Sequence, residues 1–275
     1  MFMFLKTSRP RFWIYLLGPF AVGAAAATHE LTQAPQLAAI LLGLFFAYPA
    51  NLFIYGINDV FDFETDKQNE KKLGYEQVLE PRQHTKILTT IAVACLPWLV
   101  LIPFLPLAAI ISTGACLFLG FIYSAPPIRA KIHPGLDSLT NILYIMPGLA
   151  GFYAFGGIQP PIFLVGAAML WSMAMHAYSA VPDIEADTQA KFQTIATILG
   201  GYGTLVLCAI FYLTAGTLLG LTSPLVGAIG AGVYGSLMII SIIAYKRGSI
   251  LSVYKAFPYI NTLMGAWLFF VALLQ

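Results

Sequence analysis

The sequence predicts an all-α membrane protein with about nine transmembrane helices in a single polytopic domain. Of its 275 residues, 59% are hydrophobic and only 9% are charged, whereas soluble domains carry roughly 25% charged residues. The mean hydropathy is +0.80. Apolar runs close to the ~20 residues that span a bilayer recur along the whole chain, which leaves no room for a sizeable soluble domain.

Nine apolar segments are the expected spans, and prolines mark several of the turns between them. Helix continuation is disfavoured at proline, and prolines stand in the connections at Pro35, Pro103, Pro106, Pro126, Pro127, Pro160, Pro161 and Pro224. We expect the spans at about 12–28, 36–57, 86–104, 107–124, 136–154, 160–181, 197–220, 225–245 and 256–274.

The basic residues predict how these spans are oriented. All 14 Lys and Arg lie before the first span or in the connections after the second, fourth, sixth and eighth. Basic connections mark the cytoplasmic side of a membrane protein. We therefore expect a cytoplasmic N-terminus, a C-terminus outside, and insertion in the plasma membrane of a prokaryote.

The first acidic cluster ends the second span. It reads Asn58-Asp59-x-x-Asp62-x-x-x-Asp66. Residues three and four apart share one face of a helix, so these oxygen ligands climb about two turns, or ~10 Å. Carboxylates gathered in this way repel one another, and a bound cation relieves that repulsion.

A second cluster, Asp183-Ile184-Glu185-Ala186-Asp187, ends the sixth span on the same expected side. With Glu64 counted in the first cluster, the two clusters hold seven of the 12 acidic residues. Because four spans separate them, the arrangement indicates a pseudo-duplicated domain, with halves at about 1–124 and about 136–245. The long polar connection at 66–85 is expected to cap the site from the cytoplasmic side.

Two facing carboxylate clusters suit a diphosphate bridged by Mg²⁺, which takes oxygen ligands from carboxylates and substrate phosphates together. The candidate metal ligands are Asn58, Asp59, Asp62, Asp66, Asp183 and Asp187. The alternative is that both clusters are ordinary solvated helix ends. That alternative is weakened because most of the acidic residues gather at these two places.

Cations and polar groups near the clusters are candidates to bind the donor and acceptor. A departing diphosphate needs positive charge beyond the metal, although any one of these cations can instead be a loop residue that follows the positive-inside rule. His176 within the sixth span points to function or to a bond with a neighbouring helix. The candidates are Arg9, Lys67, Arg129, Lys131, Asn141, His176 and Lys191 for binding, with Tyr123 joining the acidic residues as catalytic.

Taken together, the two motifs within nine spans resemble the UbiA superfamily of intramembrane prenyltransferases. The turn from Tyr123 to Arg129 and the segment 194–200 are also similar to family patterns, and Lys191 stands where many members have glycine. The resemblance implies a ring of nine helices around a central cavity that opens laterally to lipid. It also implies that the Asp-rich motifs bind Mg²⁺ and a prenyl diphosphate.

The implied activity is Mg²⁺-dependent transfer of a prenyl group to a lipophilic acceptor in the bilayer, with no nucleic acid involved. The opening Ser8-Arg9-Pro10-Arg11-Phe12-Trp13 is similar to a branch that includes lycopene elongases, which favours a carotenoid end as acceptor. An aromatic or quinone-precursor acceptor is the alternative. A cation-coupled transporter is the rival from another class, but its ion sites are expected near the membrane midplane, and both clusters lie at span ends.

Overall fold

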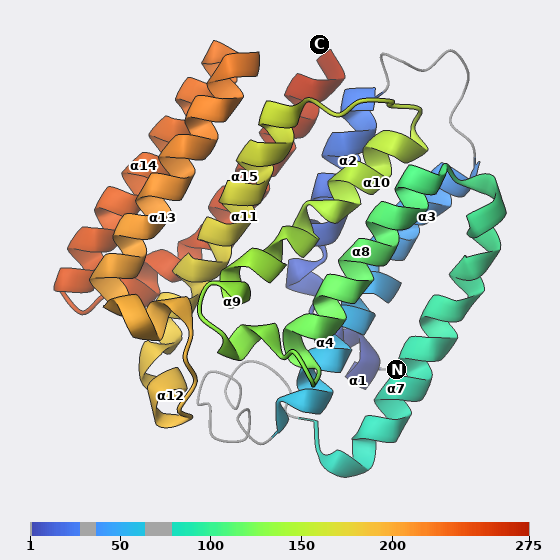
Figure 1. The fold of residues 1–275 in the computed structure, drawn as a ribbon, viewed down its shortest axis with the longest axis horizontal. Coiled ribbons are helices and arrows are strands. Elements are labelled where there is room, and N and C mark those ends of the chain that lie inside the picture. Colours follow the sequence, from blue (N-terminus) through green and yellow to red (C-terminus); the bar gives the residue numbers. More distant parts are fainter. Residues whose placement is uncertain (1, 28–36, 64–78, 275) are drawn as a thin grey trace. The chain divides into compact units, whose positions relative to one another are not determined.

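The computed structural model describes residues 2–27, 37–63 and 79–274, and its regular elements within these ranges are all helices (Figure 1). This confirms the all-α class. Seven helices in the described ranges are long and apolar enough to cross a membrane: Leu37–Phe61, Pro81–Phe104, Leu107–Ser124, Ile162–Gln189, Ile195–Thr222, Pro224–Lys246 and Ile250–Leu274. Ile14–Ala27 is a shorter apolar helix.

The chain divides into two compact units. The first contains Met1–Arg129, Met146–Ile158 and the C-terminal residues from Gly265. Within it α10 packs against α2 and α8, while α4 packs against α7 and α8. Its helices are α1 (Phe2–Thr7), α2 (Ile14–Ala27), α3 (Leu37–Ala47), α4 (Pro49–Phe61), α7 (Pro81–Cys95), α8 (Leu107–Ser124) and α10 (Met146–Ala154), with 3₁₀ segments at Pro10–Phe12 and Leu96–Phe104.

The second unit contains Ala130–Ile145 and Gln159–Met264. Here α13 packs against both α11 and α14. Its helices are α9 (Leu136–Leu139), α11 (Ile162–Ala180), α12 (Ile184–Gln189), α13 (Ile195–Thr222), α14 (Pro224–Lys246) and most of α15 (Ile250–Leu274), with 3₁₀ segments at Ala130–Ile132, Thr140–Tyr144 and Val181–Asp183.

Close helix packing in each unit depends on glycine. A Cβ atom at Gly23 in α2 would overlap the carbonyl oxygen of Gly148 in α10, and a Cβ at Gly227 in α14 would overlap the backbone of Gly220 in α13. Small residues that let backbones approach are the usual contact between helices in a bilayer, where apolar burial gives little drive to associate.

The second expected span is continuous in sequence but is broken between α3 and α4. Pro49 has no amide hydrogen and disfavours the helical conformation in the residue before it. The Asn51 side chain donates through Nδ2 to the carbonyls of Phe46 (2.7 Å) and Ala47 (3.2 Å), which satisfies the end of α3. The remainder of the span, α4, therefore carries the first acidic cluster on a separate helix.

The fifth expected span, at 136–154, is not a single helix. It consists of α9, a 3₁₀ turn over Thr140–Tyr144, and α10. Pro147 cannot donate to the carbonyl four residues earlier and restricts the residue before it, so the helix restarts at Met146. The third span begins earlier than expected, at Pro81, where Glu80 and Gln83 form a capping box.

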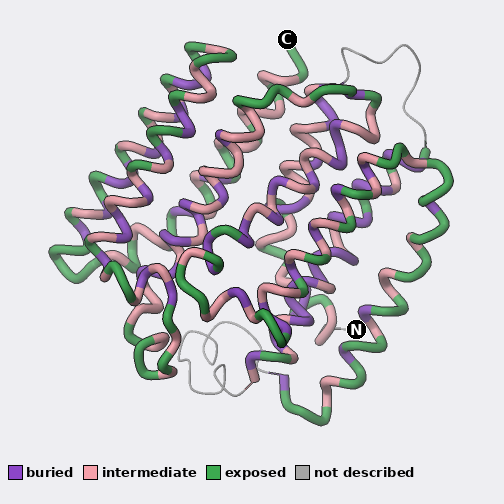
Figure 2. Tube along the Cα trace, viewed as in Figure 1, coloured by how far each residue is buried: buried purple, intermediate pink, exposed green. Residues whose placement is uncertain are grey.

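Exposed residues recur along the long helices (Figure 2), and many of them are large and apolar. Examples are Leu44, Val93, Ile111 and Leu225, which are between 56% and 68% exposed. Helices that are apolar on all sides are typical of membrane spans, which explains this surface.

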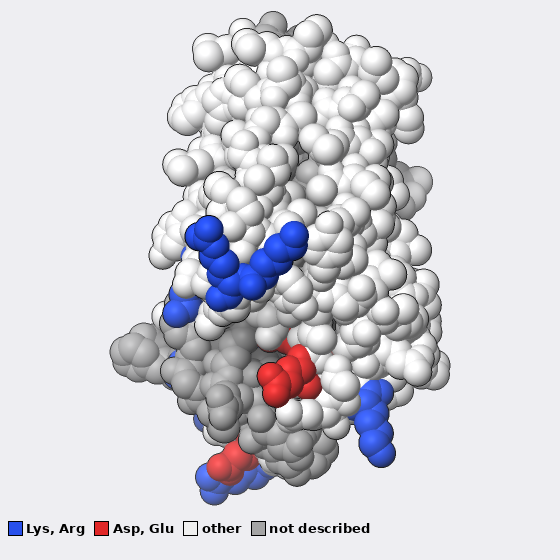
Figure 3. Space-filling model, turned by 90° about the vertical axis from the view of Figure 1, so that its left-hand side faces the viewer, with Lys and Arg blue, Asp and Glu red and all other residues white. Residues whose placement is uncertain are grey.

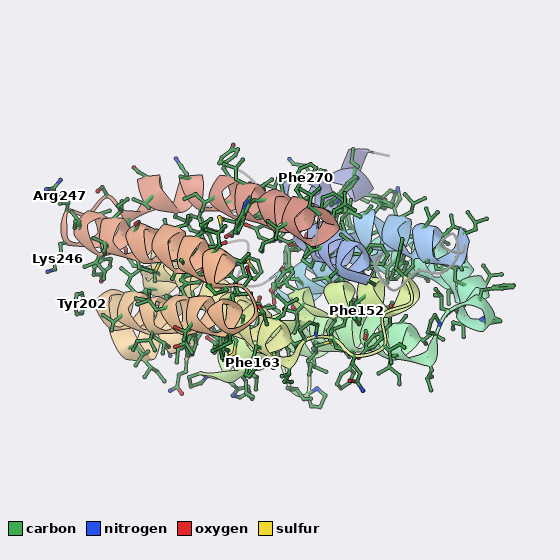
Figure 4. All side chains as sticks on the ribbon, turned by 90° about the horizontal axis from the view of Figure 1, so that it is seen from above. Phe152, Phe163, Tyr202, Lys246, Arg247 and Phe270 are labelled. Carbon is green, nitrogen blue, oxygen red and sulfur yellow. The ribbon has the colours of Figure 1, made fainter. Side chains whose placement is uncertain are left out.

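Among the described residues on the face drawn in Figure 3, the charged side chains gather toward one end. At the edge of the second unit, Tyr202, Lys246 and Arg247 lie near one another (Figure 4), with the Lys246 ammonium 5.7 Å from the Tyr202 ring centre. Long cations beside an aromatic ring at a span end commonly anchor a helix at the membrane interface.

Candidate active site

The end of α4 presents two buried carboxylates. Asp59 and Asp62 are only 2% and 4% exposed. Asp62 follows the last residue of α4, and its amide donates to the carbonyl of Asn58 at 3.0 Å. The Asn58 side chain donates in turn to Asp62 Oδ2 at 2.6 Å. Asn58 therefore holds the Asp62 carboxylate in place, as expected for residues four apart on one helix.

Arg9 neutralises the first of these carboxylates. Its guanidinium donates to Asp59 Oδ1 at 2.7 Å. The same guanidinium lies over the ring of Tyr55, 4.7 Å from the ring centre, in the geometry of a cation–π contact. Tyr55 precedes Asp59 by one helical turn, so α4 supplies both the anion and the aromatic face that position Arg9.

Arg129 stands beside the second carboxylate. Its guanidinium lies 3.6 Å from Asp62 Oδ1 and donates to the Phe61 carbonyl at 3.4 Å. Asn58 also donates to Ser124 Oγ at 3.0 Å, at the end of α8. Ser124, next to the predicted Tyr123, is therefore a residue of α8 in contact with the cluster. The sequence reasoning did not select Ser124, because a serine at a span end has no distinctive spacing.

Three of the predicted cations share an unusual backbone conformation. Arg9, Arg129 and Lys191 have φ angles of 50°, 45° and 58°, and they are the only non-glycine residues with positive φ among the residues that the structure describes. This left-handed conformation costs about 1–2 kcal/mol for an ordinary residue. Strain of this kind clusters at functional sites, which supports a role for all three.

Lys191 has a second, structural explanation. The α12 helix ends with the Phe192 amide bonded to the Asp187 carbonyl (2.8 Å) and the Lys191 amide bonded to the Thr188 carbonyl (3.1 Å). These two bonds define a Schellman motif, whose left-handed position usually holds glycine. Glycine is therefore the residue expected at this position, and the exposed Lys191 is the exception that needs a reason.

We expect Lys191→Gly to separate the two roles. The variant should gain about 1 kcal/mol of stability by removing left-handed strain. Its KM for the prenyl diphosphate should rise about tenfold, the effect of losing one charge-assisted hydrogen bond. Thermal unfolding in detergent and steady-state kinetics measure both. Lys191→Asn, which tolerates the same backbone, should show the KM change with a smaller stability gain. A wild-type KM in both variants would leave Lys191 a capping role only.

The second acidic cluster lies in the second unit, beyond α11. Asp183 ends the 3₁₀ segment Val181–Asp183, and Asp187 lies one turn later in α12. Both are partly buried, whereas Glu185 between them is exposed. The i,i+4 pair therefore shares a face that Glu185 does not, as the spacing predicted.

The structure adds an acidic residue that the sequence reasoning missed. Asp137 in α9 is fully buried and accepts hydrogen bonds from the amides of Ser138 (Oδ1, 2.7 Å) and Ile195 (Oδ2, 2.7 Å). His176 Nε2 lies 4.0 Å from Asp137 Oδ2. The missed signal was a single carboxylate at the start of an apolar run, which in a membrane protein is a candidate by itself.

The remaining predicted residues are placed as follows. Asn141 donates to the Asp137 carbonyl at 3.0 Å, so its amide serves its own turn. The Lys131 ammonium lies 5.6 Å from the Phe192 ring centre, next to Lys191 in sequence. Asp66 and Lys67, with most of the expected cap, lie outside the described residues.

Within the described ranges, no three His, Cys, Asp or Glu side chains are grouped closely enough to hold a metal ion by themselves. The donors still fit Mg²⁺ in kind. Asp59 and Asp62 are buried carboxylates, and the Asn58 amide lies against Asp62. Mg²⁺ commonly takes one or two protein carboxylates and completes its shell with phosphate and water, so a small set is sufficient.

Comparison with known proteins identifies relatives over nearly the whole chain. The model of the UbiA prenyltransferase family matches residues 16–274. Lycopene elongase/hydratase of Haloferax volcanii is 39% identical over 260 residues, covering 94% of this chain and 84% of that protein. The lycopene elongase/hydratase of Halobacterium salinarum is 38% identical over 269 residues, covering 96% and 95%.

The fold also matches solved structures. A UbiA homologue from Archaeoglobus fulgidus, bound to GPP and Mg²⁺, superposes with a TM-score of 0.74 at 21% identity, over 99% of this chain and 100% of that one. The same homologue has a structure with DMAPP and Mg²⁺ that superposes with a TM-score of 0.73. At this identity the likeness concerns the arrangement of helices.

Proposed function

The chain belongs to the UbiA prenyltransferase family, and from that membership we propose that it transfers a prenyl group from an allylic diphosphate to the alkene end of a lycopene-type carotenoid. The observation that carries the acceptor is the 38–39% identity with two lycopene elongase/hydratases over at least 94% of this chain. The spans agree with an apolar acceptor. Their described Lys and Arg residues stand within two turns of a helix end. An acidic acceptor would need a cation deeper in a span, and the described part of the spans has none.

We propose that the donor's diphosphate binds at the two acidic clusters. Asp59, Asp62 and Asp66 from one half, with Asp183 and Asp187 from the other, would hold Mg²⁺, and Asn58 would support them. A Mg²⁺ ion held there would neutralise the diphosphate and so make it a better leaving group. Structures of UbiA homologues with GPP or DMAPP and Mg²⁺ support this assignment.

The chain's own cations supply the rest of the charge. Arg9 and Arg129 already lie beside Asp59 and Asp62, so a diphosphate held by these carboxylates through metal would come within reach of both guanidiniums. Lys191, Lys131 and Lys67 are further candidates. Fixed donors aimed at the charge that develops on a leaving group are usually the largest contribution to catalysis.

The proposed reaction then follows in three steps. The C1–O bond of the donor breaks, and its electrons leave with the diphosphate. The terminal alkene of the acceptor attacks C1, which leaves a tertiary cation on the neighbouring acceptor carbon. That cation is quenched by loss of a proton or by addition of water. The chain contributes mainly position and electrostatic stabilisation.

We further propose the topology expected from the charges. Nine crossings would form a ring around a central cavity, with the pseudo-duplicated halves presenting their acidic clusters to it and the connection at 66–85 as its cytoplasmic cap. The basic connections would face the cytoplasm of a prokaryotic cell. In this topology the short apolar helix Ile14–Ala27 and the interrupted segment at 136–154 would be the two crossings beyond the seven long apolar helices.

An assay in sealed vesicles tests the proposed prenyl transfer and the proposed orientation in the membrane. Labelled dimethylallyl diphosphate is added outside vesicles that contain lycopene, and the lipid products are identified by mass spectrometry. We expect Mg²⁺-dependent elongation of lycopene in inside-out vesicles and at least tenfold less in right-side-out vesicles, because the charged donor does not cross the bilayer. Equal rates in both would refute the orientation.

The acceptor has its own control. A parallel incubation replaces lycopene with homogentisate, chosen because a homogentisate phytyltransferase of Synechocystis is 28% identical over 59% of this chain. Transfer to homogentisate and none to lycopene would overturn the carotenoid assignment and leave an aromatic prenyltransferase.

A further inference from the structure

Asp137 on α9 and His176 on α11 form a buried pair. Asp137 is 0% exposed and His176 is 13% exposed, with 4.0 Å between Nε2 and Oδ2. Asp137 also accepts from the first amide of α13, at Ile195, and from Ser138. One carboxylate is thus hydrogen-bonded to the start of α13 and to its own helix α9, and it lies beside the imidazole of His176 on α11.

The position of His176 along its helix is informative. It precedes Asp183 by seven residues, or ~10 Å at ~1.5 Å per residue. It therefore lies deeper in the apolar part of the span than the carboxylates proposed to hold the metal. The chain has four histidines. Of these, His133 follows the 3₁₀ segment Ala130–Ile132 and His84 lies in the first turn of α7, and His29 lies outside the described residues. His176 is thus the described histidine within a membrane-spanning helix, one turn before the end of α11.

A hydroxyl beside this pair has an unmet hydrogen bond. Ser138 is 3% exposed, and its Oγ finds no hydrogen-bond partner among the residues that the structure describes. Buried polar atoms are nearly always paired with protein or with an ordered water. A water needs two to four polar partners to occupy an interior site, and Ser138, Asp137 and His176 supply groups of that kind.

We propose that His176, positioned by Asp137, is the general base for the water that quenches the acceptor cation. This inference rests on the proposed function and identifies the residues of its last step. The water oxygen bonds to the tertiary acceptor carbon, one O–H bond breaks, and the proton goes to the imidazole. The products are an elongated tertiary alcohol and diphosphate, and the histidine later returns the proton to solvent.

Other groups are poorly suited to this step. Asp59 and Asp62 lie beside Arg9 and Arg129, and a carboxylate neutralised by a guanidinium or a metal is a weak base. The diphosphate lies at the end of the span rather than in its apolar part. General bases typically contribute 10²- to 10⁴-fold, which is enough to decide between addition of water and loss of a carbon-bound proton.

Asp137 also has a purely structural role to be separated from this one. Its bond to the Ile195 amide caps the start of α13, where a negative charge is favoured. A variant could therefore lose activity simply because α13 shifts. The ratio of alcohol to alkene separates the capping role of Asp137 from its positioning of His176. A disturbed α13 lowers both products together and leaves their ratio unchanged.

The test uses the full chain in liposomes with dimethylallyl diphosphate, lycopene, Mg²⁺ and H₂¹⁸O. For the wild type we expect mostly alcohol carrying one ¹⁸O atom. In His176→Gln and Asp137→Asn the ratio of alcohol to alkene should fall at least tenfold. Ser138→Ala, a smaller change, should lower the ratio in the same direction. His84→Gln, whose imidazole contacts the Leu79 carbonyl at 3.1 Å, is the matched control and should not change it.

The outcomes are distinguishable. A wild-type ratio in His176→Gln, or alkene as the main wild-type product, overturns the inference and leaves the proposed elongation intact. Equal loss of both products in Asp137→Asn with a wild-type ratio assigns Asp137 to capping and overturns its positioning role. If the wild type forms no elongated product, the proposed function fails and this inference fails with it.

Discussion

Replacing Asp62 by asparagine is expected to lower kcat/KM for the prenyl diphosphate by about 10³-fold, the upper range for loss of one group that stabilises a leaving charge. Asparagine keeps a carbonyl oxygen that can accept the Asn58 hydrogen bond, now 2.6 Å long, so the end of α4 should keep its shape. It removes the negative charge that a metal ligand provides and that faces Arg129. Turnover is measured with labelled donor at saturating lycopene.

The control for this variant comes from the second cluster. Glu185 is exposed between Asp183 and Asp187, and Glu185→Gln should stay within about twofold of the wild type, as surface changes usually do. Asp183→Asn should match the loss in Asp62→Asn if both clusters hold the diphosphate. Size-exclusion profiles and unfolding temperatures in detergent verify folding. Full turnover in either asparagine variant would remove that cluster from the mechanism.

Removal of divalent metal is expected to abolish prenyl transfer. EDTA in excess should lower turnover by at least 10³-fold, and Mg²⁺ added beyond the chelator should restore it, because the guanidiniums of Arg9 and Arg129 alone leave a diphosphate with about three negative charges poorly neutralised. The measurement is release of labelled diphosphate from the donor, which does not depend on the acceptor.

A second measurement separates binding of the metal from damage to the protein. The unfolding temperature should rise when Mg²⁺ and a prenyl diphosphate are added together, because a ligand that binds only the folded state stabilises it. The rise should be absent in Asp62→Asn. Turnover that survives EDTA would show that the carboxylates of α4 have a purely structural task, such as holding the two arginines.

The sequence alone predicted the acidic clusters because their information is local. Asp59 and Asp62 are one turn apart at the end of an apolar run, and that spacing places them on one helix face wherever the helix lies. The same holds for Asp183 and Asp187. The all-helical class followed from composition for a similar reason, since a bilayer admits few other folds for such a chain.

The missed features depend on contacts between distant residues. Ser124 matters because Asn58 reaches it across α4 and α8. Asp137 matters because Ile195, 58 positions away, donates to it. Neither pairing has a period or motif that could be read from one sequence. The interruption within 136–154 was missed because hydrophobicity alone predicts one continuous helix there. Pro147, which breaks that helix, stands within the apolar run.

The left-handed backbone of Arg9, Arg129 and Lys191 could not be predicted from the sequence, although there was one clue to it at Lys191. The sequence resemblance predicts glycine at Lys191, and the Schellman motif after α12 gives that position the left-handed backbone that glycine favours. At Arg9 and Arg129 no comparable clue exists, because arginine is not a residue that turn patterns associate with positive φ.

The pairing of Arg9 with Asp59 has a consequence for how the chain is made. A span that ends in buried carboxylates is costly to place in a membrane unless the charges are compensated. Arg9 lies 50 residues before Asp59, so that partner has already been synthesised when α4 leaves the ribosome. Arg129, the partner of Asp62, follows only after α7 and α8. The two carboxylates of the same helix therefore acquire their counter-charges at different stages of synthesis, the first during insertion of α4 and the second after two further spans.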